Sequence, residues 1–228
     1  MKGALAIFVK TPGFSPVKTR LADTIGTKSA ESFYKKSIGA IEAVAVETKR
    51  ISEGLICPYW AVGELQTLDH LLWKKFDSLY TGPGGLGRRM HHVYSHLLQS
   101  YDFVILIGSD SPQITPELIM KTAAMITETG QFVMGPARDG GFYLLGGSRS
   151  IGIERFTSVP YSCDTTGSNM VNELEKTGSV KIINQLTDVD IVEDFEPLLD
   201  ELQNCILPEQ KELSAWLQQH ALFLDQNS

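Results

Sequence analysis

Residues 102–112 read D-F-V-I-L-I-G-S-D-S-P, and they give the strongest indication of the fold. Five consecutive apolar residues, 103–107, lie between Asp102 and Gly108. An apolar run of this length with β-branched members is typical of a parallel strand that is buried on both faces. We therefore predict a strand at the centre of a sheet, with Asp110 just beyond its carboxyl end.

Strand-like and helix-like segments alternate on both sides of this strand. Before it, apolar runs predict strands at 4–9 and 55–62, and an amphipathic pattern predicts a helix that begins near Lys28 after the capping residue Thr27. After it, Thr115 and Pro116 are suited to begin a helix that continues to Thr129. The other predicted segments are a helix through Leu68, Leu71, Leu72 and Phe76, strands at 132–136, 142–145 and 180–183, and a last helix over 209–224.

This alternation predicts an α/β fold, a three-layer sandwich around a mostly parallel sheet. No linker or composition shift divides the chain, so we expect one domain over residues 1–228. The 20 Lys and Arg against 27 Asp and Glu give a formal charge of −7, which argues against a nucleic-acid partner. No apolar run approaches the roughly 20 residues of a membrane span, and we expect a cytoplasmic protein.

The segment after the first strand, residues 10–21, reads K-T-P-G-F-S-P-V-K-T-R-L. Ligands of an open parallel sheet bind beyond the carboxyl ends of its strands, so this loop is a candidate site. Lys10, Lys18 and Arg20 could clamp a polyphosphate, while Gly13 lets the backbone come close and Thr19 adds a hydroxyl. Taken alone, a solvated basic loop explains the segment equally well, and the spacing is not that of a P-loop.

Acidic residues follow two of the predicted strands. Asp110 follows the central strand, and a carboxylate there can hold a magnesium ion that bridges nucleotide phosphates. Asp188 and Asp190 follow the strand at 180–183, and alternate residues of an extended segment share a face. Asp110 in isolation is better explained as a turn residue before a proline, and Asp194 as a helix cap.

Residues 135–145 read G-P-A-R-D-G-G-F-Y-L-L. Gly140 and Gly141 allow the backbone to pass close to a ligand, Asp139 projects from the same turn, and Tyr143 could support a sugar ring. A plain β-hairpin turn explains the Asp-Gly pair equally well.

These motifs together resemble a known group of proteins. Two more motifs are G-P-G-G-L-G-R-R-M at 82–90 and D-V-D-x-x-x-D-F at 188–195. With the segments quoted above, they are similar to a bacterial family of uncharacterised GT-A proteins, which are described as glycosyltransferases linked to arsenosugar or selenium genes. The resemblance covers residues 2 to about 199. More distantly, the chain is similar to the nucleotidyltransferases that activate molybdenum cofactor and phospholactate. Two departures from the family pattern are Gly85 and Arg88, which replace acidic residues, and Tyr161 to Cys163 in place of W-S-T.

The resemblance implies a Rossmann-like nucleotide-diphospho-sugar transferase (GT-A) sheet, a nucleotide bound by the first loop, and a metal held by Asp110 and the Asp188–Asp190 pair. We expect Mg²⁺ or Mn²⁺ bound with the nucleotide. The favoured activity is transfer of a sugar from a nucleotide-diphospho-sugar to a small-molecule acceptor, with Asp139 taking the acceptor's proton. The alternatives are nucleotidyl transfer from an NTP to a phosphorylated small molecule, and nucleotide binding without catalysis.

Overall fold

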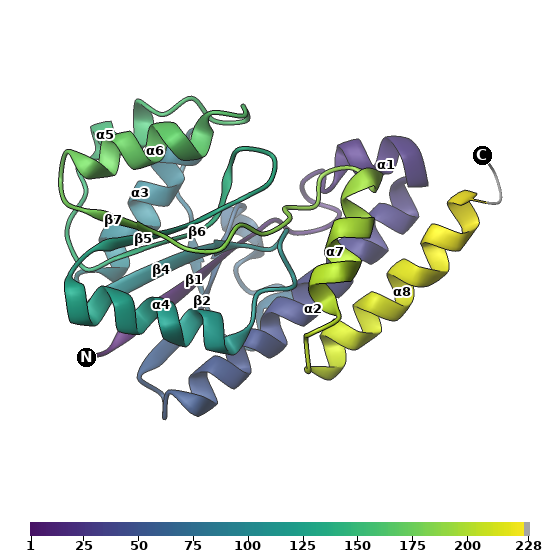
Figure 1. Cartoon of the computed structure of the whole chain (residues 1–228), viewed down its shortest axis with the longest axis horizontal. Helices are drawn as coiled ribbons and strands as arrows, with labels where there is room; N and C mark the ends of the chain where they lie inside the picture. Colours follow the sequence, from purple (N-terminus) through teal and green to yellow (C-terminus); the bar gives the residue numbers. More distant parts are fainter. Residues whose placement is uncertain (226–228) are drawn as a thin grey trace.

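The computed structural model describes residues 1–225 of the chain and is built around one seven-stranded sheet (Figure 1). The strand order is β3-β2-β1-β4-β6-β5-β7. The strands are β1 (Gly3–Val9), β2 (Ile56–Val62), β3 (Asp77–Tyr80), β4 (Phe103–Gly108), β5 (Phe132–Pro136), β6 (Phe142–Gly147) and β7 (Val180–Ile182). The α-helices are α1 (Thr19–Ile25), α2 (Thr27–Ile51), α3 (Leu86–Leu97), α4 (Pro116–Thr129), α5 (Ile153–Thr157), α6 (Thr166–Glu175), α7 (Phe195–Leu202) and α8 (Pro208–Asp225).

The predicted central strand is confirmed as β4, the fourth strand of the seven. Its residues 103–107 are all buried, as expected for a strand that is covered on both faces. β1 pairs in parallel with both β2 and β4, β2 with β3, and β5 with β7. Only β6 runs antiparallel, between β4 and β5. The sheet is therefore mostly parallel, and the carboxyl ends of β1, β2 and β4 meet at one edge.

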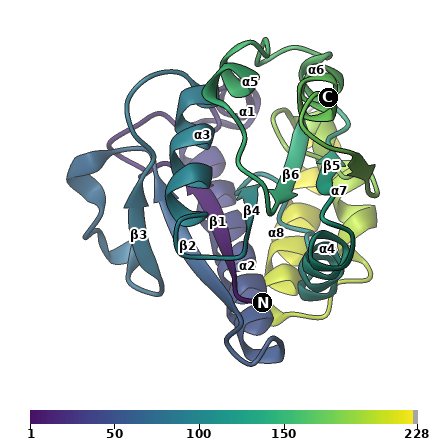
Figure 2. The same cartoon turned by 90° about the vertical axis from the view of Figure 1, so that its left-hand side faces the viewer.

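Helices cover both faces of the sheet and make the three predicted layers (Figures 1 and 2). Alternate residues of a strand point to opposite faces, so β1 places Leu5 and Ile7 in one core and Ala4 and Ala6 in the other. The first core also contains side chains of α2 and α4, and the second contains side chains of α3, α5 and α6. The α/β sandwich that the sequence predicts is confirmed.

The C-terminal helices form a third, outer cluster with the N-terminal part of the chain. Phe33 of α2 packs against Phe195 and Trp216, with ring centroids 5.4 and 6.0 Å apart. This packing holds the segment before α7, which carries Asp188 and Asp190, beside the N-terminal loop. The helix predicted over 209–224 is confirmed as α8.

The helix predicted through Leu68 and Phe76 is wrong. The segment forms two single 3₁₀ turns, Leu65–Thr67 and Leu71–Trp73, and then the edge strand β3. Its apolar residues serve the core without a helix, because Trp73 is fully buried with its ring 5.2 Å from that of Trp60. The apolar residues whose spacing predicted a helix are instead packed into the core from turns and a strand.

The loop predicted over residues 10–21 is shorter than expected, because α1 begins at Thr19. Lys18 stands immediately before α1 in a left-handed conformation, with φ of 49°. That conformation costs a non-glycine residue roughly 1 to 2 kcal/mol, so the surrounding contacts must hold Lys18 in place. Among the described residues, no helix is both long enough and apolar enough to cross a membrane.

Candidate functional site

A cleft of about 670 Å³ opens at the sheet edge where the parallel strands end. Its wall includes residues that follow β1, β2, β3 and β4, the turn between β5 and β6, the loop before α6 and the segment before α7. The position is the one that an open parallel sheet favours for ligands, because loops from several strands converge there. Ten of the twelve site residues predicted from the sequence line this cleft; they are Lys10, Lys18, Thr19, Arg20, Asp110, Asp139, Gly141, Tyr143, Asp188 and Asp190.

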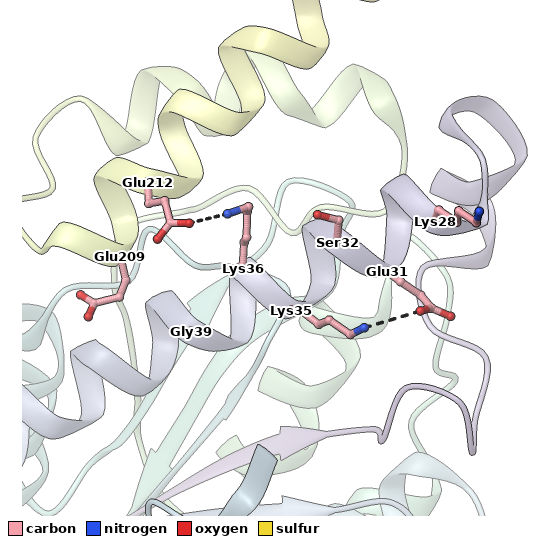
Figure 3. Close-up of a pocket in the computed structure, with 8 residues that line it drawn as sticks. All are labelled: Lys28, Glu31, Ser32, Lys35, Lys36, Gly39, Glu209 and Glu212. Atoms are coloured by element: carbon pink, nitrogen blue, oxygen red, sulfur yellow. Dashed lines mark hydrogen bonds and ion pairs between the residues drawn. The ribbon is translucent and has the colours of Figure 1, made fainter. Parts of the chain in front are cut away.

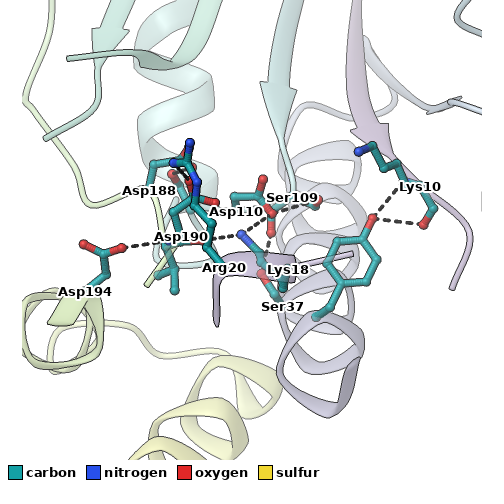
Figure 4. A network of polar contacts seen from close by, with 12 residues as sticks. Lys10, Lys18, Arg20, Ser37, Ser109, Asp110, Asp188, Asp190 and Asp194 are labelled. Carbon is teal, nitrogen blue, oxygen red and sulfur yellow. Dashed lines mark hydrogen bonds and ion pairs between the residues drawn. The ribbon is translucent and has the colours of Figure 1, made fainter. Parts of the chain in front are cut away.

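Lys18 and Asp110 form an ion pair at the centre of the cleft (Figure 4). Lys18 Nζ lies 2.7 Å from Asp110 Oδ1, and the same ammonium donates a hydrogen bond to the Val189 carbonyl. The Lys18 side chain is only 4% exposed, while that of Asp110 is 39% exposed. The backbone completes the link, since the Val189 amide donates to the Asp110 carbonyl at 3.0 Å. The first loop and the segment before α7 are thus held to the end of β4.

Arg20 and Asp190 form a second, more open ion pair beside the first (Figure 4). Arg20 Nη1 lies 2.7 Å from Asp190 Oδ2, and the Arg20 side chain is 67% exposed. Asp194 has the capping role predicted for it, because its Oδ2 accepts from the backbone amides of Asp190 and Ile191 at 2.7 and 2.9 Å. The side chain of Asp190 thus lines the cleft in its pair with Arg20, while that of Asp194 organises the backbone.

Asp188 is the carboxylate of the cleft with the most perturbed acidity. It accepts a hydrogen bond from Ser111 Oγ at 3.1 Å, and no Lys or Arg of the described chain forms an ion pair with it. Burial, together with repulsion from Asp110, raises the pKa of Asp188 from its usual 3.8 to about 7. Lys18 acts in the opposite direction but does not outweigh these effects. The cleft therefore concentrates negative charge that a cation would stabilise.

The turn between β5 and β6 carries the residues predicted for the acceptor side. Asp139 is exposed and its Oδ1 accepts from the Gly141 amide at 2.9 Å. Gly140 has φ of 87°, and a Cβ on it would lie 2.0 Å from the carbonyl oxygen of Asp164. Gly140 is absent from the cleft wall, and its role is to let the loop before α6 pack against this turn. The Gly167 amide fixes the contact by donating to the Gly140 carbonyl at 2.8 Å.

Tyr143 and Gly13, two other predicted site residues, have structural roles. Tyr143 lines the cleft but is only 3% exposed, and its hydroxyl donates to the Asn184 carbonyl at 2.8 Å. It therefore contributes the floor beneath the turn. Gly13 lies in the first loop outside the cleft wall, and its φ of 85° shows that it serves the turn of that loop.

Arg89 and Tyr34 also line the cleft, and the sequence did not indicate either as a site residue. Arg89 donates to the Gly63 and Gly84 carbonyls and to Thr81 Oγ1, so its charge is fixed near the ends of β2 and β3. The hydroxyl of Tyr34 donates to the carbonyl of Lys10 and accepts from its amide. Burial is the main cause that raises the pKa of Tyr34, with repulsion from Asp110 second. Arg89 lies in the quoted 82–90 motif, whereas nothing in the sequence distinguishes Tyr34 from a core residue of α2.

The donor set of the cleft suits a hard divalent cation in part. Among the described residues, no three His, Cys, Asp or Glu side chains converge as a complete metal site. The Asp110 carboxylate and the Val189 carbonyl nevertheless converge on one positive charge, the ammonium of Lys18. Oxygen ligands of this type are those that Mg²⁺ and Mn²⁺ prefer, and Mg²⁺ is commonly held by one or two carboxylates together with substrate phosphates. The residues present fit an ion that a bound phosphate helps to hold.

Charge is distributed unevenly along the cleft. Four cationic side chains line it: Lys10 and Lys18 come from the first loop, Arg20 from α1 and Arg89 from α3. The turn between β5 and β6 and the loop before α6 contribute Asp139 and Asp164 to the wall and, within the described chain, no Lys or Arg. The adjacent Arg138 is not part of the wall and is paired with Glu201 at 3.1 Å.

A second hollow of about 570 Å³ lies on the outside of the molecule, between α2 and α8 (Figure 3). Charged side chains of both signs line it, and Lys36 Nζ lies 2.5 Å from Glu212 Oε1 across it. None of the predicted site residues lies there. We interpret it as a solvated groove between two helices, because exposed ion pairs of this kind contribute little beyond solubility.

Comparisons with known proteins agree with this fold. Residues 59–163 match a family described as "Uncharacterized protein conserved in bacteria (DUF2064)", which bears out the resemblance to an uncharacterised bacterial family. No curated protein matches the chain. Among solved structures, a candidate nucleotide-diphospho-sugar transferase from Desulfovibrio desulfuricans G20 is similar, with a TM-score of 0.84 and 23% sequence identity over 99% of this chain and 98% of that chain.

Two more distant solved structures have the same general architecture. The 4-diphosphocytidyl-2C-methyl-D-erythritol synthase of Anaerococcus prevotii DSM 20548 has a TM-score of 0.54 and 11% identity, over 95% of this chain and 98% of that one. Rv0371C of Mycobacterium tuberculosis H37Rv, solved as a complex with manganese, has a TM-score of 0.51 and 13% identity, over 88% of this chain and 99% of that one. These likenesses confirm the predicted nucleotide-diphospho-sugar transferase fold.

Proposed function

We propose that this protein is a transferase that uses a nucleotide-activated donor, and that it moves a sugar from a nucleoside diphosphate sugar to a hydroxyl group of a small acceptor. The observation that carries the proposal is the cleft itself, in which Lys18 and Arg20 meet Asp110 and Asp190 at the ends of the parallel strands. Cations there can take up the negative charge of a leaving diphosphate, and the acids beside them can share a divalent ion with it.

Each group of the cleft has a separate task in this reaction. Lys10, Lys18 and Arg20 bind and orient the diphosphate, because charge-assisted hydrogen bonds to phosphate are strong and directional. Asp110 and Asp190, with Asp188 close by, would hold a divalent ion, which would supply positive charge beside the leaving diphosphate. Asp139 accepts the proton of the acceptor hydroxyl, and its Oδ2 makes no hydrogen bond within the described residues.

The uneven charge along the cleft favours sugar transfer over nucleotidyl transfer. In nucleotidyl transfer the attacking group is a phosphate, which needs cations at the acceptor end. The turn between β5 and β6 and the loop before α6, where the acceptor is expected, instead present Asp139 and Asp164. Carboxylates accept hydrogen bonds from hydroxyl groups and repel a phosphate, so a neutral, hydroxyl-bearing acceptor suits this end better.

Nucleotidyl transfer is the second candidate, because the fold is shared with a 4-diphosphocytidyl-2C-methyl-D-erythritol synthase. Both reactions use the same cations and the same metal, but their leaving groups differ. Sugar transfer releases a nucleoside diphosphate, whereas nucleotidyl transfer releases pyrophosphate. Product identity therefore decides between them.

The test has two stages. A thermal-shift screen of nucleoside diphosphates, triphosphates and nucleotide sugars, with and without Mg²⁺ or Mn²⁺, identifies the donor class. A ligand that binds only the folded state adds about 2.7 kcal/mol at a hundredfold excess over its dissociation constant, which is readily visible. The donor that binds is then incubated with a panel of polyols and sugars, and the products are separated. Release of pyrophosphate, or donor binding with no turnover against any acceptor, contradicts the proposal.

A further inference from the structure

Two of the three cations predicted to bind phosphate are paired, in the structure, with carboxylates predicted to bind metal. Lys18 contacts Asp110 and Arg20 contacts Asp190, each at 2.7 Å (Figure 4). The two pairs differ in burial, because the Lys18 side chain is 4% exposed and the Arg20 side chain 67% exposed. Water screens the Arg20 pair strongly and the Lys18 pair weakly. The Lys18 pair is the one that can control what else approaches Asp110.

Several contacts fix the position of the Lys18 ammonium. It lies between Asp110 Oδ1 and the Val189 carbonyl, two oxygens from different segments of the chain. It also lies 5.9 Å from the ring centroid of Phe33, a residue of the outer aromatic cluster. The left-handed backbone of Lys18 aims the side chain inward from the start of α1. The ammonium is thus held at the point where oxygen donors of the cleft converge.

A divalent cation and the Lys18 ammonium cannot share this position. Two positive charges a few ångströms apart repel, and the repulsion is larger in a part of the cleft that excludes water. The carboxylate that Lys18 contacts, that of Asp110, is also one that a metal would need. Without a new partner for Lys18, metal binding therefore leaves a buried ammonium without its counter-ion. Donor phosphates, bound by the same loop, offer Lys18 such a partner.

We propose that Lys18 is an internal counter-ion that occupies the cation position at Asp110 until donor phosphates draw its ammonium away, so that metal and donor bind together. This inference rests on the proposed function, because it needs a phosphate-bearing donor in the first loop. It assigns Lys18 two partners in turn, Asp110 without donor and phosphate with donor. As a consequence, Lys18 prevents divalent ions from binding to the protein in the absence of donor.

The experiment measures Mn²⁺ binding directly, by the electron paramagnetic resonance signal of free Mn²⁺ and by calorimetry. Lys18→Met keeps most of the aliphatic stem and removes the charge. Lys18→Gly removes the charge and also suits the left-handed backbone, so it tests the same point if the first variant is unstable. Lys10→Met is the matched control, because Lys10 lines the same cleft and loses the same charge but has no ion-pair partner among the described residues.

Without nucleotide, both Lys18 variants are expected to bind Mn²⁺ about tenfold more tightly than the wild type, and the control within about twofold of it. Adding a nucleoside diphosphate that the wild type binds should increase Mn²⁺ affinity strongly in the wild type and less in the Lys18 variants. Folding is checked by thermal melting of each protein.

Three outcomes overturn the inference. If both folded Lys18 variants bind Mn²⁺ no better than the wild type, Lys18 does not keep divalent ions from Asp110. If Lys10→Met gains as much as Lys18→Met, the effect is general electrostatics of the cleft. If ADP, CDP, GDP and UDP all fail to bind the wild type, the proposed function fails and the donor-driven exchange fails with it. The first two outcomes leave donor binding intact, so the two failures are distinguishable.

Discussion

Asp188 should make the protein less stable as the pH rises, and replacing it should remove that effect. A carboxyl group whose pKa is higher in the folded state than in the unfolded chain binds more protons when folded. Its contribution to stability therefore falls between the unfolded pKa, near 3.8, and the folded pKa, about 7. The cause is the burial of Asp188 and its proximity to Asp110, which penalise the ionised form.

The size of the effect follows from the difference in pKa. Between about pH 5 and pH 8 the folded protein loses roughly 2 kcal/mol more from this group than it would with an unperturbed carboxyl. Asp188→Asn is uncharged at both pH values, and its Oδ1 can still accept from Ser111. We therefore expect the variant to be more stable than the wild type, by roughly 2 kcal/mol more at pH 8 than at pH 5.

Urea unfolding of both proteins at the two pH values gives the required double difference, in which titrating groups that do not interact with Asp188 cancel. Asp69→Asn is the matched control, because Asp69 is exposed and has no ion-pair partner among the described residues. Its stability relative to the wild type should not change with pH by more than about 0.5 kcal/mol. An Asp188→Asn variant whose advantage is the same at both pH values, or which is less stable at pH 8, refutes the reasoning.

Three further predictions concern the same cleft. Gly140→Ala should lower the free energy of unfolding by roughly 3 kcal/mol, because the new Cβ overlaps the Asp164 carbonyl and the backbone has positive φ. Gly13→Ala also has positive φ but open space around it, so it should lower the free energy of unfolding by only about 1 kcal/mol in thermal or urea unfolding. Arg20→Ala should change the melting temperature by no more than about 2 °C, because the pair is exposed, yet weaken nucleotide binding roughly ten- to a hundredfold in calorimetry; unchanged affinity would make Arg20 a surface charge. Asp139→Asn should keep the donor affinity and lose at least about a hundredfold in transfer rate; loss of donor binding instead would place Asp139 at the nucleotide.

The class of fold and most of the residues that line the candidate cleft can be predicted from residue order alone. The apolar run at 103–107 identified the central strand, because only a strand covered on both faces needs such a run. From that strand, the rule that ligands bind beyond the carboxyl ends of parallel strands selected Lys18, Asp110 and Asp190, which the structure brings into one cleft. Local chemistry of this kind depends on residue order alone, and so it can be predicted without coordinates.

The pairing of those residues depends on the tertiary structure. Lys18 and Asp110 are 92 positions apart in the chain, and Arg20 and Asp190 are separated by 170, so no local pattern links them. The packing of Phe195 and Trp216 on Phe33 brings the segment before α7 beside the first loop and creates both ion pairs. The same dependence on distant contacts explains the segment 65–80, where an apolar spacing typical of a helix is used by two turns and an edge strand. Pairing between remote segments depends on the free energy of the whole packed core, which cannot be derived from patterns among neighbouring residues.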